Sequence, residues 1–150
     1  MIIGIKFEIP NKYDSYLSKI LKNIKLEDNI FRITEDDAFI PGCKFLFDFD
    51  TYDGEELKKI ISKPSYYVNF SNIQRYKKEE DIEEINYYSD FLKNKCTFLM
   101  LVIDSIFVEV YSKDISEIET IKKNAEENMF TKIKYITDDE VLNQKLKCGF

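Results

Sequence analysis

The most apolar run of the chain, from Cys96 to Lys113, does most to limit how the chain can fold. Residues 97–103 are almost continuously apolar, which is typical of a strand that is covered on both faces. In residues 106–110, Ile and Val then recur at every second position, as they do in a half-buried strand. Only Asp104 and Ser105 interrupt the run, with no crossover segment between the two strands. The sequence therefore predicts a central antiparallel β-hairpin.

Asp104 is open to two interpretations. As the turn of the hairpin it would be exposed and structural. Buried inside the apolar run, its carboxyl group would have a raised pKa and would be a candidate acid or base. We favour the turn, although Asp-Ser is not among the preferred two-residue turns.

Strands and helices alternate irregularly along the rest of the chain. Strands are predicted over residues 1–9, 30–33, 38–40, 44–50, 66–72, 97–103, 106–111 and 130–137. Helices are predicted to begin at Asn11, Asp53, Asn86, Asp114 and Asp138, the first running to Ile24 and the last including Leu142 and Leu146. Between these elements, residues 34–37 are predicted to turn and residues 74–85 to form a loop. This order favours an α+β fold: a single domain over residues 1–150, with one mixed, mainly antiparallel sheet and helices packed against it.

Charge and composition narrow the classes of function. The net charge is −6, and the 22 basic side chains are interleaved with 28 acidic ones. No cationic footprint for a phosphate backbone is visible, so no nucleic-acid partner is expected. The one basic stretch, residues 75–78, runs into acidic residues and is interpreted as a solvated loop. The chain has no histidine, which removes Ser-His-Asp and Cys-His nucleophile systems and histidine-ligated metals. The sequence does not decide whether the protein is an enzyme, although it favours a protein without catalytic activity. No cofactor is predicted.

The sequence also predicts a compartment. Met1–Ile5 has neither the basic segment nor the cleavage site of a signal peptide. The longest apolar run, Phe98–Ile103, is too short to span a bilayer. We therefore expect a cytoplasmic protein without a membrane partner, its thiols reduced.

Three stretches together resemble a known family. They are Gly4–Tyr13 (GIKFEIPNKY), the pair Ile103–Ser105 and Tyr111–Asp114 (IDS and YSKD), and Tyr135–Asp138 (YITD). In this order they are similar to domain of unknown function 2691, a small family from relatives of Bacillus and Clostridium. The resemblance would cover nearly the whole chain. It implies a single cytoplasmic domain and carries over no functional residues.

Asp48, Asp50 and Asp53 form the first candidate site. The predicted strand 44–50 has one buried face, with Phe45, Phe47 and Phe49 on one side and Leu46, Asp48 and Asp50 on the other. Asp48 and Asp50 thus share a face, and Asp53 follows at the end of the strand. Converging carboxylates could bind Mg²⁺ or Ca²⁺, although the spacing does not match a calcium-binding loop. In the alternative interpretation, Asp48 and Asp50 face solvent and Asp53 caps a helix.

The cysteines and tyrosines supply the remaining candidates. Cys43, Cys96 and Cys148 form no CxxC pair, so neither a zinc site nor a thioredoxin-like motif is indicated. A nucleophilic cysteine would have only Lys44 or Lys95 as a neighbouring base. The alternative is that Cys96 belongs to the core and that the other two are incidental.

Tyrosines occur as two adjacent pairs, Tyr66-Tyr67 and Tyr87-Tyr88, whose rings should point in different directions. Tyrosine is enriched at binding surfaces, which makes Tyr66, Tyr67 and Tyr87 a candidate surface. The alternative is that these rings border the protein's own core.

Two classes of function follow. The first is a non-catalytic protein that binds another macromolecule, as a regulator, an accessory subunit or an immunity-type inhibitor. Its acidic charge suits a basic protein partner. The alternative is a divalent-metal-dependent hydrolase or a small-ligand-binding protein that uses Asp48, Asp50 and Asp53. The sequence does not indicate an oligomeric state.

Overall fold

The apolar run forms the predicted hairpin at the centre of the sheet. The structure is a computed structural model that describes residues 1–141 and 144–149. In it, β6 (Phe98–Ile103) and β7 (Phe107–Ser112) pair antiparallel. Both strands are hydrogen-bonded to neighbours on their outer sides, so the hairpin lies inside the sheet. Continuous apolar character therefore corresponds to a strand covered on both faces, as predicted.

Asp104 is the turn residue of this hairpin. It is exposed, and Asp104 and Ser105 have φ angles of 52° and 66°. The Ile106 N–H donates to the Ile103 carbonyl oxygen at 3.2 Å, which closes the turn. Positive φ at both central residues gives the turn the backbone twist that connects antiparallel strands well.

The sheet contains eight strands in the described part of the chain, and all their pairings are antiparallel. Their order is β3-β2-β5-β6-β7-β1-β8, and β4 also pairs with β2. The other strands are β1 (Ile2–Glu8), β2 (Ile30–Ile40), β3 (Lys44–Phe45), β4 (Thr51–Asp53), β5 (Tyr67–Tyr76) and β8 (Thr131–Thr137). The helices are α1 (Tyr16–Ile20), α2 (Gly54–Ile61), α3 (Tyr88–Lys93), α4 (Ile115–Glu127) and α5 (Asp138–Val141), with a 3₁₀ turn over Glu79–Asp81. The fold is therefore α+β, as predicted, with a sheet that is antiparallel throughout.

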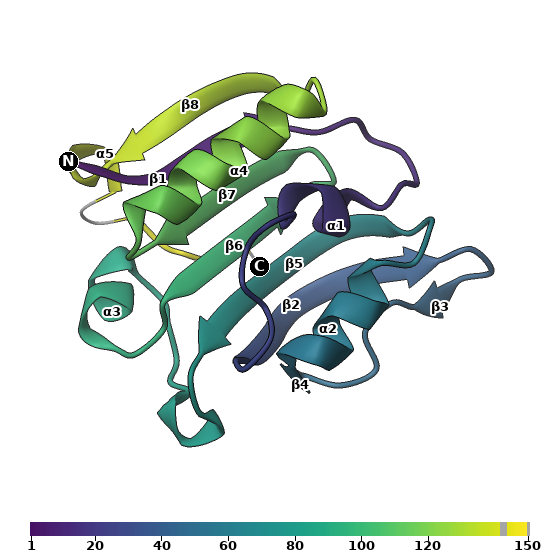
Figure 1. The fold of residues 1–150 in the computed structure, drawn as a ribbon, viewed down its shortest axis with the longest axis horizontal. Coiled ribbons are helices and arrows are strands. Elements are labelled where there is room, and N and C mark those ends of the chain that lie inside the picture. Colours follow the sequence, from purple (N-terminus) through teal and green to yellow (C-terminus); the bar gives the residue numbers. More distant parts are fainter. Residues whose placement is uncertain (142–143, 150) are drawn as a thin grey trace.

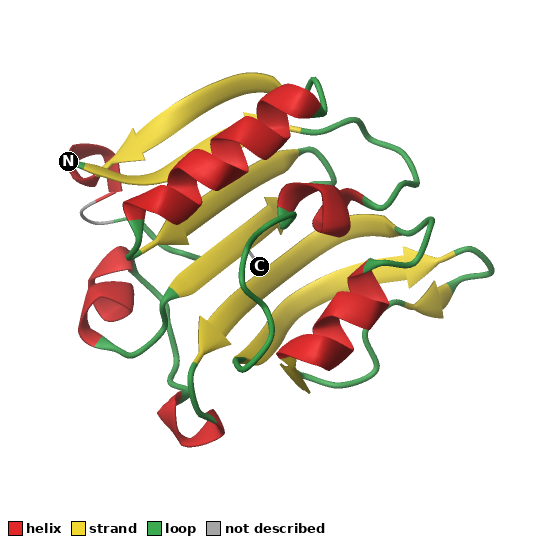
Figure 2. Ribbon diagram, viewed as in Figure 1, coloured by secondary structure: helices red, strands yellow, loops and turns green. Residues whose placement is uncertain are grey.

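The two faces of the sheet are covered differently. One face, here called the helix face, is covered by α1, α2 and α4 (Figures 1 and 2), over a core that includes Leu17, Leu57 and Ile121. The opposite face, here called the far face, carries a second core. This core includes side chains of α3, Val141 of α5 and Leu146 of the C-terminal segment. Each central strand thus contributes alternate side chains to two cores.

Two predicted breaks in the sheet are in fact strand. Residues 34–37 were predicted to turn, but β2 runs through them and accommodates an irregularity in its pairing with β5 between Thr34 and Asp37. Glu35 has a φ of 53° there, and the extra residue is absorbed as a bulge. The loop predicted from residue 74 is wrong at its start, since β5 extends to Tyr76. A bulge lets a strand continue through polar residues that look like a turn in the sequence.

The predicted strand over residues 44–50 is also wrong. Only Lys44 and Phe45 pair as β3, and the chain then bends through residues 46–50. Leu46 and Phe47 are adjacent and both buried, which an extended strand covered on one face does not allow. The alternation of Phe and Asp in this stretch therefore does not mark two faces of a strand.

Helix ends account for most of the remaining differences. The first helix begins after Ser15 and not at Asn11, and the chain continues as turns after Ile20. The third begins after Tyr87 and not at Asn86. In the final helix, the predicted position of Leu142 lies outside the described residues, and Leu146 is buried outside the helix. Apolar positions were better predicted than caps, because burial repeats along a helix whereas a cap is a single residue.

Candidate functional site

The most exposed aromatic side chains of the described chain lie on one short segment. We call residues 45–50 the acidic aromatic loop; their sequence is Phe-Leu-Phe-Asp-Phe-Asp. Phe45 is 64% exposed and Phe49 is 71% exposed. Leu46 and Phe47 point the other way and belong to the core of the helix face. The loop thus has an anchored side and an exposed aromatic side.

Tyr52 fixes the conformation of the loop. Its ring is buried, and its hydroxyl oxygen accepts hydrogen bonds from the backbone N–H groups of Asp48 at 2.9 Å and Phe49 at 2.8 Å. The Ile33 N–H donates to the Asp50 carbonyl oxygen at 2.8 Å, which attaches the end of the loop to β2. The two exposed rings therefore project from a backbone held by buried and sheet-bound groups.

The predicted metal-site residues lie in this loop and at the start of α2. Asp48 and Asp50 are exposed, in agreement with the alternative interpretation of the sequence. Asp53 caps α2, since its Oδ1 accepts the Glu56 N–H at 2.8 Å and Glu56 Oε1 accepts the Asp53 N–H at 3.2 Å. The hydrogen bond from the Glu56 backbone holds the pKa of Asp53 below its ordinary value. The Asp53 carboxylate is thus used as the N-cap of α2.

The three aspartates are not brought together as metal ligands. Within residues 1–141 and 144–149, no group of three or more His, Cys, Asp or Glu side chains is arranged to hold a metal ion.

What the loop and the start of α2 share is negative charge. Asp48, Asp50 and Asp53 are followed by Glu55 and Glu56, and all five side chains are exposed. The segment from β3 to α2 therefore carries five exposed carboxylates and two exposed phenylalanine rings, distributed along β2 from Phe39, opposite Phe45, to Ile30, opposite Asp53.

Sequence reasoning placed the three phenylalanines of this loop on one buried face. The structure buries Phe47 and exposes Phe45 and Phe49. A repeating Phe-x-Phe-x-Phe pattern is the same whether the repeated face meets a core or solvent. No local signal would have identified the exposed pair, because the tertiary contacts of Leu46 and Tyr52 decide how the loop bends.

The predicted tyrosine surface does not exist as a unit. Tyr66 is fully buried, and its hydroxyl group donates to the Ile61 carbonyl oxygen at 2.7 Å, so it is not a surface residue. Tyr67 is half-buried, with its hydroxyl oxygen 2.7 Å from Ser105 Oγ. Tyr87 is 42% exposed and precedes α3. Figure 1 places α3 at the opposite end of the sheet from the start of β5, so Tyr67 and Tyr87 cannot contact one partner patch. The rings of each adjacent pair do differ in exposure, as expected.

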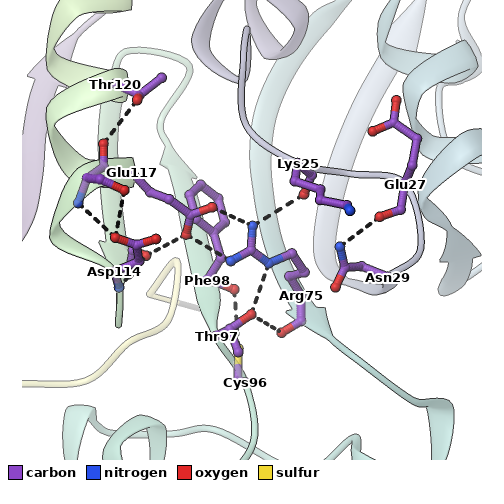
Figure 3. A network of polar contacts seen from close by, with 12 residues as sticks. Lys25, Glu27, Asn29, Arg75, Cys96, Thr97, Phe98, Asp114, Glu117 and Thr120 are labelled. Carbon is purple, nitrogen blue, oxygen red and sulfur yellow. Dashed lines mark hydrogen bonds and ion pairs between the residues drawn. The ribbon is translucent and has the colours of Figure 1, made fainter.

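Arg75 was assigned to a solvated loop, but it is a buried residue of β5. Its Nη1 and Nη2 atoms lie 2.7 and 2.8 Å from the two carboxylate oxygens of Glu117 on α4, and its Nε donates to Thr97 Oγ1 at 2.9 Å (Figure 3). The Arg75 guanidinium also lies over the Phe98 ring, 5.3 Å from its centroid.

Asp114 and Glu117 have the spacing of a capping box, which the sequence therefore suggests, but Glu117 is not the partner of Asp114 in the structure. Asp114 caps α4 by accepting the Ser116 N–H at 2.9 Å, while Glu117 turns inward to Arg75 (Figure 3). A fully paired cluster of this kind serves the structure, since it leaves no group free for a substrate.

Two of the three cysteines are unsuited to nucleophilic chemistry. Cys96 and Cys148 are buried, and burial raises the pKa of Cys96 to about 11 and that of Cys148 to about 12. The thiolate that attacks or binds a metal is thus disfavoured at both. Cys43 is exposed, in the turn before β3. Cys96 is a core residue, as predicted, and Cys148 is one as well.

No helix within the described residues is both long and apolar enough to cross a membrane. Residues 2–147 match the family described as Protein of unknown function (DUF2691). The chain is also 23% identical over 141 residues to the uncharacterized protein YncE of Bacillus subtilis (strain 168), a similarity that covers 91% of this chain and 92% of that protein. No solved structure matches the chain.

Proposed function

The chain belongs to the DUF2691 family of proteins of unknown function, and on that premise we propose that it binds a protein partner with a basic surface through the acidic aromatic loop. The observation that carries this proposal is the exposure of Phe45 and Phe49 on a loop held in place by Tyr52. Large aromatic side chains supply most of the binding energy in many protein interfaces. Exposed apolar patches on a protein surface often mark interaction sites.

The fixed backbone strengthens the proposal. Binding a flexible loop costs conformational entropy, roughly 0.5–1.5 kcal/mol for each side chain that becomes immobilised. Here the backbone N–H groups of Asp48 and Phe49 already donate hydrogen bonds to the Tyr52 hydroxyl oxygen. The loop is thus organised before a partner arrives, and less of the interaction energy is lost on ordering it.

Charge indicates the kind of partner. Asp48 and Asp50 flank Phe49 in sequence, and the exposed Glu55 and Glu56 follow at the start of α2, in a chain whose net charge is −6. Such a surface accelerates association with a basic protein and disfavours an acidic one. The expected complex has the two phenylalanine rings in apolar pockets, surrounded by ion pairs between the aspartates and lysine or arginine side chains of the partner.

Affinity capture with matched variants tests the proposal. The tagged protein is incubated with lysate of its own cells, and the proteins it retains are identified by mass spectrometry. We expect a basic protein that is retained by the wild type and lost with the Phe45→Ser/Phe49→Ser variant and with the Asp48→Lys/Asp50→Lys variant. The control is Glu79→Lys/Glu80→Lys, which makes the same charge change at two exposed residues elsewhere.

The isolated complex then gives the quantitative test. Phe49→Ala should weaken binding by about tenfold or more, as expected for a loss of at least 1.4 kcal/mol. Charge reversal should slow association, and its effect should shrink as salt rises, since the Debye length falls to about 3 Å at 1 M. Equal retention by the wild type and both loop variants would rule out this loop as the binding surface.

A further inference from the structure

The second core covers only part of the far face. It includes Leu99 and Leu101 of β6, Tyr111 of β7 and Ile136 of β8. Towards the hairpin turn, the same face of the same strands is open, and a hollow of about 510 Å³ lies there. This volume is within the range of sites for small molecules. It is distant in sequence from the acidic aromatic loop and shares no residue with it.

Strand register determines which side chains face the hollow. Gly4 is opposite Tyr111, and two residues further along the same strands Lys6 is opposite Glu109 on β7. On its other side, Lys6 is opposite Lys134 on β8. Since side chains alternate between faces, these three lie on the far face with Tyr111. Lys6 is thus the middle member of a row that crosses three neighbouring strands.

Both lysines of this row lack an ion-pair partner among the residues that the structure describes. Neither Lys6 nor Lys134 forms an ion pair or a side-chain hydrogen bond with any described residue. Glu109, the nearest carboxylate along the row, accepts the Tyr111 hydroxyl at 2.6 Å instead. Like charges directly opposite each other across two strands destabilise a sheet. An anion bound between the two ammonium groups would remove that repulsion.

The floor of the hollow is apolar. Phe107 is 44% exposed and lies in the hollow with Ile103, its partner across the hairpin. Glu8 also lines the hollow, and its carboxylate is 3.5 Å from Lys132 Nζ. Together the lining holds three lysines and two glutamates, which gives a local excess of positive charge in an acidic protein.

We propose that this hollow binds a small amphiphilic anion, with its carboxylate, sulfonate or similar head between Lys6 and Lys134 and its apolar body against Phe107 and Ile103. The two unpaired ammonium groups recognise the head, and the exposed ring covers the body. The proposal does not rest on the proposed function, because it uses different residues. The Phe45→Ser/Phe49→Ser loop variant should therefore bind the anion as the wild type does.

A displacement assay tests this proposal. The fluorescent sulfonate 1-anilinonaphthalene-8-sulfonate serves as the probe, laurate as the competitor and dodecanol as the uncharged counterpart of laurate. We expect the probe to bind the native protein, laurate to displace it at micromolar concentration, and dodecanol to be at least tenfold weaker. Laurate should also raise the thermal midpoint, because it binds only the folded state.

Matched variants localise the binding. Lys6→Met/Lys134→Met should weaken laurate binding at least tenfold while the thermal midpoint without ligand changes little, since the variant removes both the repulsion between Lys6 and Lys134 and the attraction between Lys6 and Glu109. Phe107→Ala should weaken laurate and dodecanol alike. The control is Lys63→Met/Lys123→Met, which removes the same charge from two exposed lysines without side-chain partners. Equal affinities in the Lys6/Lys134 variant and this control, or no binding of laurate by the wild type, would overturn the proposal.

Discussion

Arg75 of β5 and Glu117 of α4 form a two-point ion pair that fastens the longest helix to the middle of the sheet. Both side chains are largely buried, with relative exposures of 9% and 14%. Glu117 also contacts Ser112 of β7, whose hydroxyl group donates to Glu117 Oε1 at 2.7 Å. Three elements, β5, β7 and α4, therefore meet at one carboxylate.

Removing this carboxylate should be strongly destabilising. Glu117→Ala leaves the Arg75 guanidinium buried without its partner, which we expect to cost roughly 3 kcal/mol of unfolding free energy. Urea unfolding followed by circular dichroism measures the loss. Arg75→Met/Glu117→Leu should cost clearly less than the sum of the two single changes, since no unpaired charge remains. Glu127→Ala, at an exposed position of the same helix, is the control, and a similar loss there would contradict this role of the pair.

Asp14 should make stability depend on pH in acid. The hydrogen bond from Lys19, whose Nζ is 2.7 Å from Asp14 Oδ2, lowers the pKa of the Asp14 carboxyl in the folded protein. Because the Asp14 pKa is lower in the folded than in the unfolded protein, its ionised carboxylate stabilises the fold at every pH above the unfolded-state pKa, which is near 3.9. This stabilisation is lost as the pH falls through the folded-state pKa. Between pH 6 and pH 3, wild type should therefore lose more stability than Asp14→Asn. Parallel pH profiles of the two proteins would show that the ion pair contributes nothing.

Asp104→Ala should destabilise the hairpin modestly. Alanine at a φ of 52° carries the steric cost of a left-handed conformation, roughly 1 kcal/mol. Asp104→Asn should be neutral or slightly stabilising, because asparagine tolerates this conformation. Urea unfolding of the three proteins compares these effects. A large loss with both substitutions would show that the carboxylate itself is needed.

Only one thiol of the native protein should react quickly with Ellman's reagent. Cys43 is exposed, whereas Cys96 and Cys148 are buried and burial raises the pKa of each thiol. We expect one fast equivalent in the native protein, three in urea, and no fast equivalent in native Cys43→Ser. Two fast equivalents in the native protein would mean that one buried segment opens readily.

Divalent cations should leave the thermal midpoint unchanged. Asp48 and Asp50 are exposed on a bent loop, and Asp53 is engaged in capping α2. Millimolar Mg²⁺, Mn²⁺ or Ca²⁺ added to protein treated with EDTA is therefore not expected to stabilise it. A shift that is present in the wild type and absent from Asp48→Asn/Asp50→Asn would revive the metal site as a hypothesis.

The parts of the fold that could be predicted have a local cause. The hairpin at residues 98–112 and the helix starts at Asp53 and Asp114 each follow from short-range patterns. Where the prediction failed, a distant contact overrode the local pattern. Arg75 comes just before the charged residues 77–81, yet it lies on β5, where it pairs with Phe31 of β2 and Phe98 of β6. Its side chain pairs with Glu117, which is 42 residues away.

The candidate sites show the same limit. The sequence singled out Asp48 and Asp50, which do lie on the proposed binding surface, but for metal chemistry that the structure does not support. Phe49 was assigned to a buried face. Nothing in the sequence indicated the row of Lys6 and Lys134, since 128 positions separate them and only strand register brings them together.

The sequence by itself determined the α+β class, the central hairpin, the positions of most strands and the absence of histidine chemistry. Hydrophobic periodicity and residue chemistry act over a few positions, so they can be read without a structure. Only the tertiary structure decided which apolar and charged side chains remain exposed. That choice depends on whether another element covers them: Tyr52 and Leu46 bend the loop that exposes Phe49, and the far-face core ends before it reaches Lys6 and Phe107.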